Sequence, residues 1–171
     1  MLNRFKNQLI AKVITRFPGL AKRFIDAYEP WASGEPTPWT PVTKPLSACR
    51  VALVTTSGVH HRGQQPFDMQ DSEGDPSIRE IDGTTIGDDY LITHDYYDHS
   101  DAEKDLNIIL PVDRLRELQS EGVIGSLAPR HCSLMGHIDG RHIATLIGES
   151  AGKIIAGLRQ DAVDVVLLTP A

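Results

Sequence analysis

The sequence predicts an α/β fold in which a parallel, doubly wound sheet carries helices on both faces. Short, β-branched apolar runs such as Val51–Val54 alternate with longer amphipathic stretches of helical period. Aromatic residues make up only 6% of the 171 residues, which favours this Rossmann or flavodoxin-like packing over an all-β sandwich. The last run, Val163–Thr169, hardly alternates, so we expect an inner strand covered on both faces.

Residues 1–28 form a separate feature. Apolar residues recur there every three or four positions, which predicts an amphipathic helix that Pro18-Gly19 kinks or splits. Six basic residues and one acidic residue give this segment a charge of +5, whereas the whole chain carries −6. Such a helix can lie on an anionic membrane or imitate a transit peptide. Docking on an acidic body or a partner subunit is the favoured interpretation.

Residues 29–47 are rich in proline and carry Trp31 and Trp39, which predicts an extended arm pinned to a surface by the indole rings. Residues 48–171 are expected to form the α/β domain. Its elements after the first strand are short strands at Ser77–Ile81, Tyr90–Thr93 and His131–Met135, and helices at Pro111–Gly122 and Gly140–Gln160. The glycines of the last helix, Gly148, Gly152 and Gly157, suggest close packing against a neighbour.

Composition excludes several classes of protein. The charge of −6 argues against a general nucleic-acid-binding surface. No apolar run approaches the roughly 18 residues of a membrane span, so a membrane partner is not expected. Cys49 and Cys132 form no CxxC motif, and no secretory signal is visible, which leaves the cytoplasm as the expected location.

The expected site lies where the predicted strands end. The first strand runs into Thr55-Thr56-Ser57-Gly58 and then into a loop with paired histidines, and ligands collect at the carboxyl ends of strands in open α/β sheets. A single histidine is more often structural, but several at one edge favour proton transfer. The clustered histidines are His60, His61, His94, His99, His131 and His137, whereas His142 is interpreted as a surface residue.

The stretch Thr93–His99 also suggests a metal site. Metallo-β-lactamase-fold hydrolases use His-x-His-x-Asp-His, which His94, Asp98 and His99 match, but Tyr96 stands in place of the second histidine. Phenol is a poor substitute for imidazole at zinc. A metal-dependent hydrolase is therefore an alternative, and no metal is expected under the favoured hypothesis.

Several stretches together resemble a known family, the selenoprotein B subunits of glycine, sarcosine, betaine and D-proline reductases, and most closely the D-proline type. The resemblance covers residues 38–171 in order. It includes PWTPVTKPL (38–46), VALVTTSGVH (51–60), PFD (66–68), Ser77 with Arg79, His94 with Tyr97-Asp98, residues 104–131, Met135-Gly136 and DAVDVVLLTPA (161–171).

The resemblance implies a reductase that cleaves a carbon–nitrogen bond of an amino acid or amine such as glycine, betaine, sarcosine or D-proline. It implies a partner subunit with a pyruvoyl group, a selenocysteine nucleophile, and a thioredoxin-like or other thiol electron donor. In the family the selenocysteine follows the strand that matches Val165–Thr169, which places it just after Ala171. Neither Cys49 nor Cys132 matches it, so we expect the chain alone to be inactive.

Two explanations of this position stay open. A UGA codon read as a stop is favoured, with the α/β domain then incomplete at its C-terminus. The other is a natural short form that binds a small ligand or a partner without catalysis.

Within the resemblance, His60 is expected to donate a proton to the leaving amine, and His94 and Asp98 complete the expected catalytic set. Arg79 is a candidate contact for a substrate carboxylate, because a guanidinium matches carboxylate geometry. The remaining expected substrate-binding residues are Ser57, Gly58, Tyr97 and Gly136. No bound cofactor is expected on this chain.

Overall fold

The computed structural model describes residues 2–17, 19, 22, 26, 39–84 and 89–170. The expected kink at Pro18 and most of the expected arm, including Trp31, lie outside the described residues. The chain forms two compact units, which we describe separately. The first contains Met1–Thr43 and Asp95–Asp98, and the second contains Lys44–His94 and His99–Ala171.

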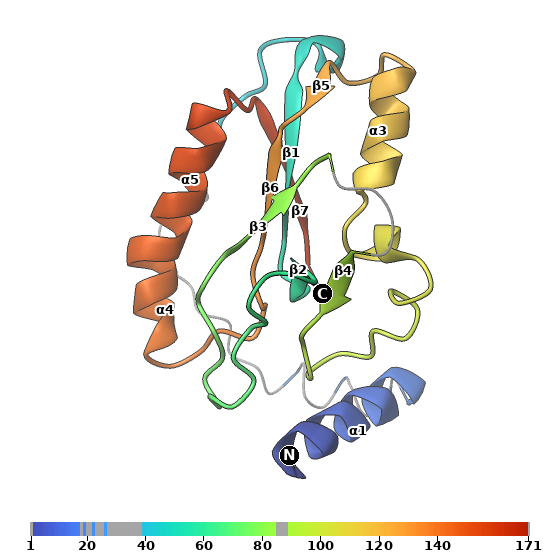
Figure 1. The fold of residues 1–171 in the computed structure, drawn as a ribbon, viewed down its shortest axis with the longest axis vertical. Helices are drawn as coiled ribbons and strands as arrows, with labels where there is room; N and C mark the ends of the chain where they lie inside the picture. Colours follow the sequence, from blue (N-terminus) through green and yellow to red (C-terminus); the bar gives the residue numbers. More distant parts are fainter. Residues whose placement is uncertain are drawn as a thin grey trace. The chain divides into compact units, whose positions relative to one another are not determined.

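The second unit is built around one mixed sheet (Figure 1). Strand β1 (Arg50–Thr55) pairs in parallel with β7 (Val165–Thr169) on one side, and with β5 (Ser126–Leu127) and then β6 (Arg130–Ser133) on the other. Strand β3 (Arg79–Asp82) extends the sheet beyond β6 and runs antiparallel to it. Two short strands, β2 (Val59–His61) and β4 (Tyr90–Ile92), form a separate antiparallel pair.

Helices stand on opposite sides of the strands (Figure 1). On one side is α3 (Val112–Ser120), whose Val112 and Leu115 are buried, as the sequence pattern predicts. On the other side, α4 (His142–Thr145), a π-helical turn η3 (Leu146–Ser150) and α5 (Ala151–Gln160) form one continuous helical segment. Two short 3-10 helices complete the described part of this unit: η1 spans Leu46–Ala48 and η2 spans Leu106–Ile108.

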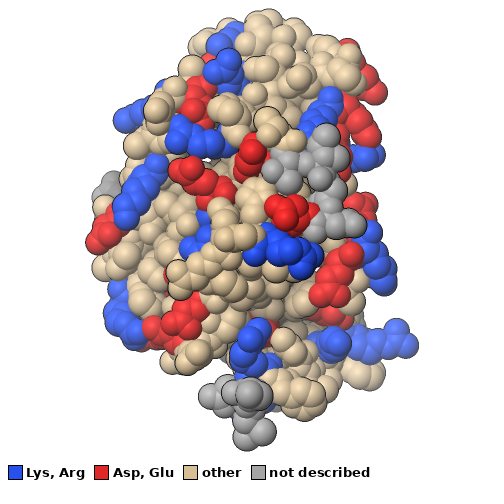
Figure 2. Space-filling model, in the orientation of Figure 1, with Lys and Arg blue, Asp and Glu red and all other residues tan. Residues whose placement is uncertain are grey.

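The core lies against one face of β1. Alternate residues of a strand point to the same face, so Val51 and Leu53 of β1 face the same side. There they belong to one cluster with residues of α3 and of the segment before α3. The cluster consists of Val51, Leu53, Val59, Ile81, Ala102, Ile109, Leu110, Val112, Leu115 and Ile124. On the face drawn in Figure 2, acidic and basic side chains are interspersed rather than gathered by sign.

A buried histidine accepts a backbone hydrogen bond from the central strand. Strands β5 and β6 follow each other along β1, and Ala128 and Pro129 lie between them. At this gap the backbone N–H of Leu53 donates to Nδ1 of His131, at 3.1 Å. His131 is fully buried. Burial, and to a smaller extent the positive charge of Arg116, lowers the pKa of His131 to about 4.

This burial predicts a loss of stability in mild acid. Between pH 6.5, the ordinary pKa of histidine, and about 4, the unfolded chain binds a proton that folded His131 does not. The free energy of unfolding should therefore fall as the pH drops through this window, by up to about 3 kcal/mol. Urea unfolding at several pH values measures it. The variant His131→Gln keeps an acceptor without titrating, and a slope as steep as that of the wild type would contradict the assignment.

Four expectations about this unit are wrong. The sheet is mixed rather than parallel, because β3 runs antiparallel to β6, and residues 56–78 between β1 and β3 contain no crossover helix of the kind that a parallel connection needs. Within the described part of the chain, β7 pairs with β1 alone and is an edge strand, with Leu168 68% exposed. A Cβ at Gly148 or Gly152 would meet nothing within 4 Å, so close packing does not explain these glycines. His60 lies in strand β2 and is fully buried, whereas the sequence predicts a loop.

The first unit contains helix α1, Leu2–Arg16. Its polar side contacts Asp95 of the same unit, a side chain that is only 1% exposed. The Arg4 guanidinium donates to this carboxylate at 2.7 Å, and the Gln8 amide donates to it at 2.7 Å. The hydrogen bond to this carboxylate raises the pKa of Arg4.

Candidate functional site

The carboxyl ends of three parallel strands meet at one edge of the sheet. In the register of the sheet, Thr55 at the end of β1 lies beside Ser133 of β6 and beside Thr169 of β7. The segments that follow these residues therefore leave the sheet together. This edge is where an α/β sheet places its ligands, because the strands hold the following loops rigidly.

A hydroxyl network ties the ends of β1 and β7 together. Thr55 and Ser57, both fully buried, share a hydrogen bond of 2.7 Å between their hydroxyl oxygens. The hydroxyls of Thr55 and Thr169 both reach the carbonyl oxygen of Ile109, at 3.0 and 2.9 Å. The backbone N–H of Thr56 donates to the carbonyl oxygen of Thr169. The end of β7 is thus fixed against the residues that follow β1.

Two glycines make room for His94 at this edge. Gly58 and Gly136 both have positive φ, 72° and 90°, which glycine adopts without strain. A Cβ on Gly136 would lie 3.2 Å from Nε2 of His94, and one on Gly58 would lie 3.1 Å from the His94 Cβ. His94 itself is buried. The structure therefore brings together three of the residues that the sequence predicts for the site.

Gly58 also connects two loops that are distant in sequence but adjacent in space. Its N–H donates to the carbonyl oxygen of Leu134, and its carbonyl accepts from the N–H of Thr93. The end of β1, the end of β6 and the end of β4 are held together through this single residue. A scaffold fixed in this way can hold a polar side chain such as His94 in one orientation.

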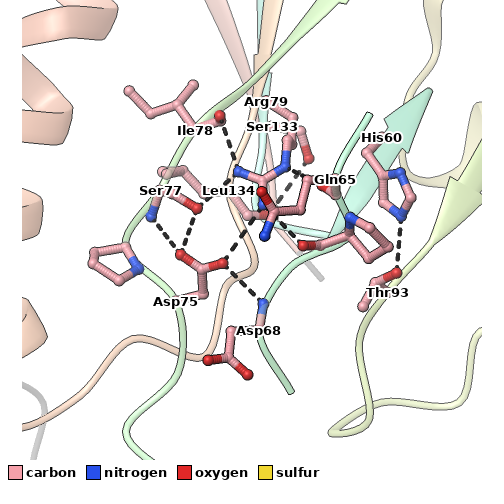
Figure 3. A network of polar contacts seen from close by, with 12 residues as sticks. His60, Gln65, Asp68, Asp75, Ser77, Ile78, Arg79, Thr93, Ser133 and Leu134 are labelled. Carbon is pink, nitrogen blue, oxygen red and sulfur yellow. Dashed lines mark hydrogen bonds and ion pairs between the residues drawn. The ribbon is translucent and has the colours of Figure 1, made fainter. Parts of the chain in front are cut away.

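His60 lies beside this edge, and both of its ring nitrogens form hydrogen bonds, of which Figure 3 shows the one to Thr93. Nδ1 is 2.9 Å from the carbonyl oxygen of His61, which can only accept, so neutral His60 carries its proton on Nδ1. Nε2 then accepts the hydrogen bond of the Thr93 hydroxyl, at 2.8 Å. A proton on Nε2 could therefore leave this ring through the Thr93 hydroxyl. No sequence pattern predicts this pairing, because the two residues are 33 positions apart.

Arg79 clamps the segment that follows β2 (Figure 3). Its Nε and Nη2 atoms donate to the carbonyl oxygens of Gln65 and Pro66, at 2.6 and 3.0 Å. Its Nη1 atom donates to Ser77, at 2.7 Å. The guanidinium also lies 4.3 Å above the ring of Phe67, which in turn meets His60 edge-on. A substrate carboxylate at Arg79 would have to replace one of these contacts.

Asp75 completes the clamp. Its carboxylate accepts from the backbone N–H groups of Asp68 and Ser77 and lies 3.6 Å from Nη2 of Arg79. Burial alone would raise the pKa of Asp75, but the hydrogen bonds from Ser77 and Asp68 and the charge of Arg79 outweigh it and hold the pKa below its usual value. The carboxylate therefore stays ionised at neutral pH and balances the guanidinium.

Replacing Arg79 by lysine should destabilise the chain by about 2 kcal/mol, although the charge is kept. An ammonium group cannot reach two carbonyls and Ser77 together, so carbonyl oxygens lose their donors. Thermal unfolding measures the loss. Arg114→Lys on α3, where the side chain is 59% exposed and pairs with Glu117, is the matched control and should be neutral. Equal unfolding of both variants would show that the clamp does not stabilise the fold.

The other expected site residues are placed differently. Tyr97 and Asp98 belong to the first unit, and His99 to the second, where its ring pairs with Glu103. Among the described residues, the side chains close enough to share a metal ion are Asp71, Glu73 and His142, which do not include the three expected metal ligands. Arg141 already forms ion pairs with both of those carboxylates. Cys132 is buried, which raises the pKa of its thiol to about 11.

The chain matches a family of known proteins over most of its length. The model of the glycine/sarcosine/betaine reductase selenoprotein B family matches residues 25–171. No solved structure matches the chain.

Individual relatives are components of reductase complexes. The chain is 40% identical to D-proline reductase subunit gamma of Acetoanaerobium sticklandii over 78% of this chain and 53% of that protein. It is 34% identical to the sarcosine reductase complex component B subunit beta of Peptoclostridium acidaminophilum, over 77% of this chain and 30% of that one. It is 33% identical to the glycine reductase complex component B subunit gamma of Carboxydothermus hydrogenoformans, over 82% of this chain and 32% of that protein.

The chain spans about half the length of the first of these relatives and about a third of the other two. The family match, in contrast, covers all of the second unit, including every strand end that forms the candidate site. The chain belongs to the glycine/sarcosine/betaine reductase selenoprotein B family.

Proposed function

We propose that the chain is the N-terminal portion of a reductase subunit that cleaves a carbon–nitrogen bond of a small amino acid or amine, such as D-proline, glycine, sarcosine or betaine. The observation that supports this most strongly is the meeting of β1, β6 and β7 at one edge. In the family the selenocysteine follows the strand that matches β7. A nucleophile there would enter the edge that Ser57, Gly58, His94 and Gly136 form.

The reaction needs two electrons and two protons for each bond cleaved, one proton for the leaving amine and one for the carbon. The selenolate attacks the carbon, a carbon–selenium bond forms, and the amine leaves with the bonding electron pair. A thiolate then attacks selenium, so that the carbon leaves as the reduced product and takes up a proton, and a selenenylsulfide remains. An external dithiol, such as a thioredoxin-like protein, returns the two electrons. A selenolate suits the first step because it is ionised and strongly nucleophilic at neutral pH.

The chain's own residues would bind and orient the substrate. We assign proton delivery to the leaving amine to His60, with His94 of the same unit as the other catalytic residue there. Ser57, Gly58 and Gly136 of that unit would shape the pocket, and Arg79 is the candidate contact for a carboxylate. A pyruvoyl group on a partner subunit would bind the amine as an electrophile. Cys132 is no substitute for selenium, because its raised pKa keeps the thiol protonated.

The test uses the full-length subunit together with its partner subunits and a dithiol. D-Proline, glycine, sarcosine and betaine are each supplied, and the reduced product and the released amine are measured. Dithiol-dependent product from at least one substrate is expected, and mass spectrometry should find selenium in the peptide after β7. A serine in place of that selenocysteine should abolish turnover. Absence of both selenium and product would overturn the proposal in favour of a non-catalytic binding module.

A further inference from the structure

Helix α1 presents an apolar surface to solvent. Phe5, Leu9, Val13 and Phe17 recur every four residues, a step that advances only about 40° around a helix. All four are exposed, with Phe5 at 68% and Phe17 at 58%, and so is Ile10. An ordinary surface helix turns such a stripe inward. We call these five side chains the apolar stripe of α1.

The helix is held by its opposite side. Arg4 and Gln8 bind the buried carboxylate of Asp95, and Ala11 next to them is buried. These contacts lie within the first unit and fix the rotation of the helix about its axis. The exposure of the apolar stripe therefore follows from the polar contacts of α1. A helix that only failed to pack would not bury its polar side.

The charge around the apolar stripe indicates what covers it. Lys6, Lys12 and Arg16 are exposed on the same helix, and no acidic residue occurs between Leu2 and Phe17. This contrasts with the net charge of −6 of the whole chain. Apolar side chains bordered by cations match the boundary between the acyl chains and the anionic headgroups of a membrane, where such helices lie in the plane.

The extent of the family match favours lipid over a subunit of the reductase complex. The family model begins at residue 25, so α1 lies outside the part of the chain that the family shares. An interface common to the family's complexes would be expected within the shared part. Among the described helices, none is long and apolar enough to cross a membrane.

We propose that α1 docks the protein on an anionic lipid surface through the apolar stripe and its bordering cations. This proposal is independent of the proposed reductase activity, because it concerns the first unit and requires no turnover. On the sequence alone, docking on protein is the favoured interpretation of residues 1–28. The structure favours lipid over protein instead, because the polar side of α1 is bound to Asp95 and the apolar stripe is left exposed.

The test is sedimentation of the 171-residue chain with vesicles. Vesicles of phosphatidylcholine and phosphatidylglycerol in equal parts should bind the chain, and pure phosphatidylcholine should bind it far more weakly. Removing two cations in Lys6→Gln/Lys12→Gln should weaken partitioning about thirtyfold, since each surface cation contributes about fivefold. Leu9→Gln/Val13→Gln should weaken it at least tenfold. Ile155→Gln, at an exposed apolar residue of α5, is the matched control and should bind like the wild type.

Circular dichroism should show equal folding of all these variants, because every substituted side chain is exposed. Equal binding to neutral vesicles, or no binding to anionic ones, would overturn the proposal. A dimer in analytical ultracentrifugation that Leu9→Gln/Val13→Gln dissociates would assign the apolar stripe to a second copy. If Leu9→Gln/Val13→Gln lost affinity for a purified partner subunit without a change in vesicle binding, the apolar stripe would be assigned to that subunit. Either of these two results would also overturn the lipid proposal.

Discussion

Alanine at Gly136 is expected to destabilise the chain by about 3 kcal/mol or more and to displace His94. The backbone at Gly136 has a φ of 90°, where a side chain is strained whatever the space around it. A Cβ there would also lie 2.1 Å from the carbonyl oxygen of Thr56, closer than any real contact, and 3.2 Å from Nε2 of His94. Since Thr56 is fixed by its hydrogen bond to Thr169, the backbone has little freedom to retreat.

Urea unfolding measures the loss of stability, and the ring resonances of the histidines in an NMR spectrum report the displacement of His94. Gly152→Ala is the matched control. This glycine lies within α5, and a Cβ there would meet nothing within 4 Å. The control should be neutral or more stable by up to about 1 kcal/mol, because alanine favours a helix. If Gly136→Ala unfolded like the control, the close packing of the strand ends would be refuted.

The sequence predicts the elements of the α/β unit better than their arrangement. Apolar runs identify β1 and β7 because a short, β-branched stretch has few other uses in a folded chain. The edge position of β7 depends on which strands lie beside it, and no local pattern carries that information. The antiparallel direction of β3 could not be predicted for the same reason, because it depends on how the chain connects β3 to the sheet and not on the residues of β3.

The site divides in the same way. Small residues after a strand predict where the edge lies, and Ser57, Gly58, His94 and Gly136 do come together there. The partners of each side chain come from distant segments and could not be predicted. Thr93 reaches His60 only because β2 and β4 pair. In a sequence, an arginine is equally consistent with a substrate contact and with a structural donor to carbonyl oxygens. Only the fold shows that Arg79 donates to the carbonyl oxygens of Gln65 and Pro66.

The largest expected effect on catalysis concerns His60, and it rests on the proposed function. In the full-length subunit assembled with its partners, His60→Gln should lower turnover about 10²-fold or more, because the leaving amine loses its proton donor. Some stability should also be lost, since the ring is fully buried and both its nitrogens are bonded. His131→Gln, which replaces an equally buried histidine away from the strand ends, shows how much turnover such a loss alone removes.

The tautomer of His60 sharpens this prediction. Because Nδ1 holds its proton against the His61 carbonyl, a proton delivered from Nε2 has to pass through the Thr93 hydroxyl. Thr93→Val removes that hydroxyl at nearly constant shape and should lower turnover about as much as His60→Gln, whereas Thr93→Ser keeps the hydroxyl and should remain close to the wild type. Steady-state turnover across pH distinguishes the variants. Equal rates for the valine and serine variants would exclude the hydroxyl route, and wild-type turnover in His60→Gln would remove His60 from the mechanism.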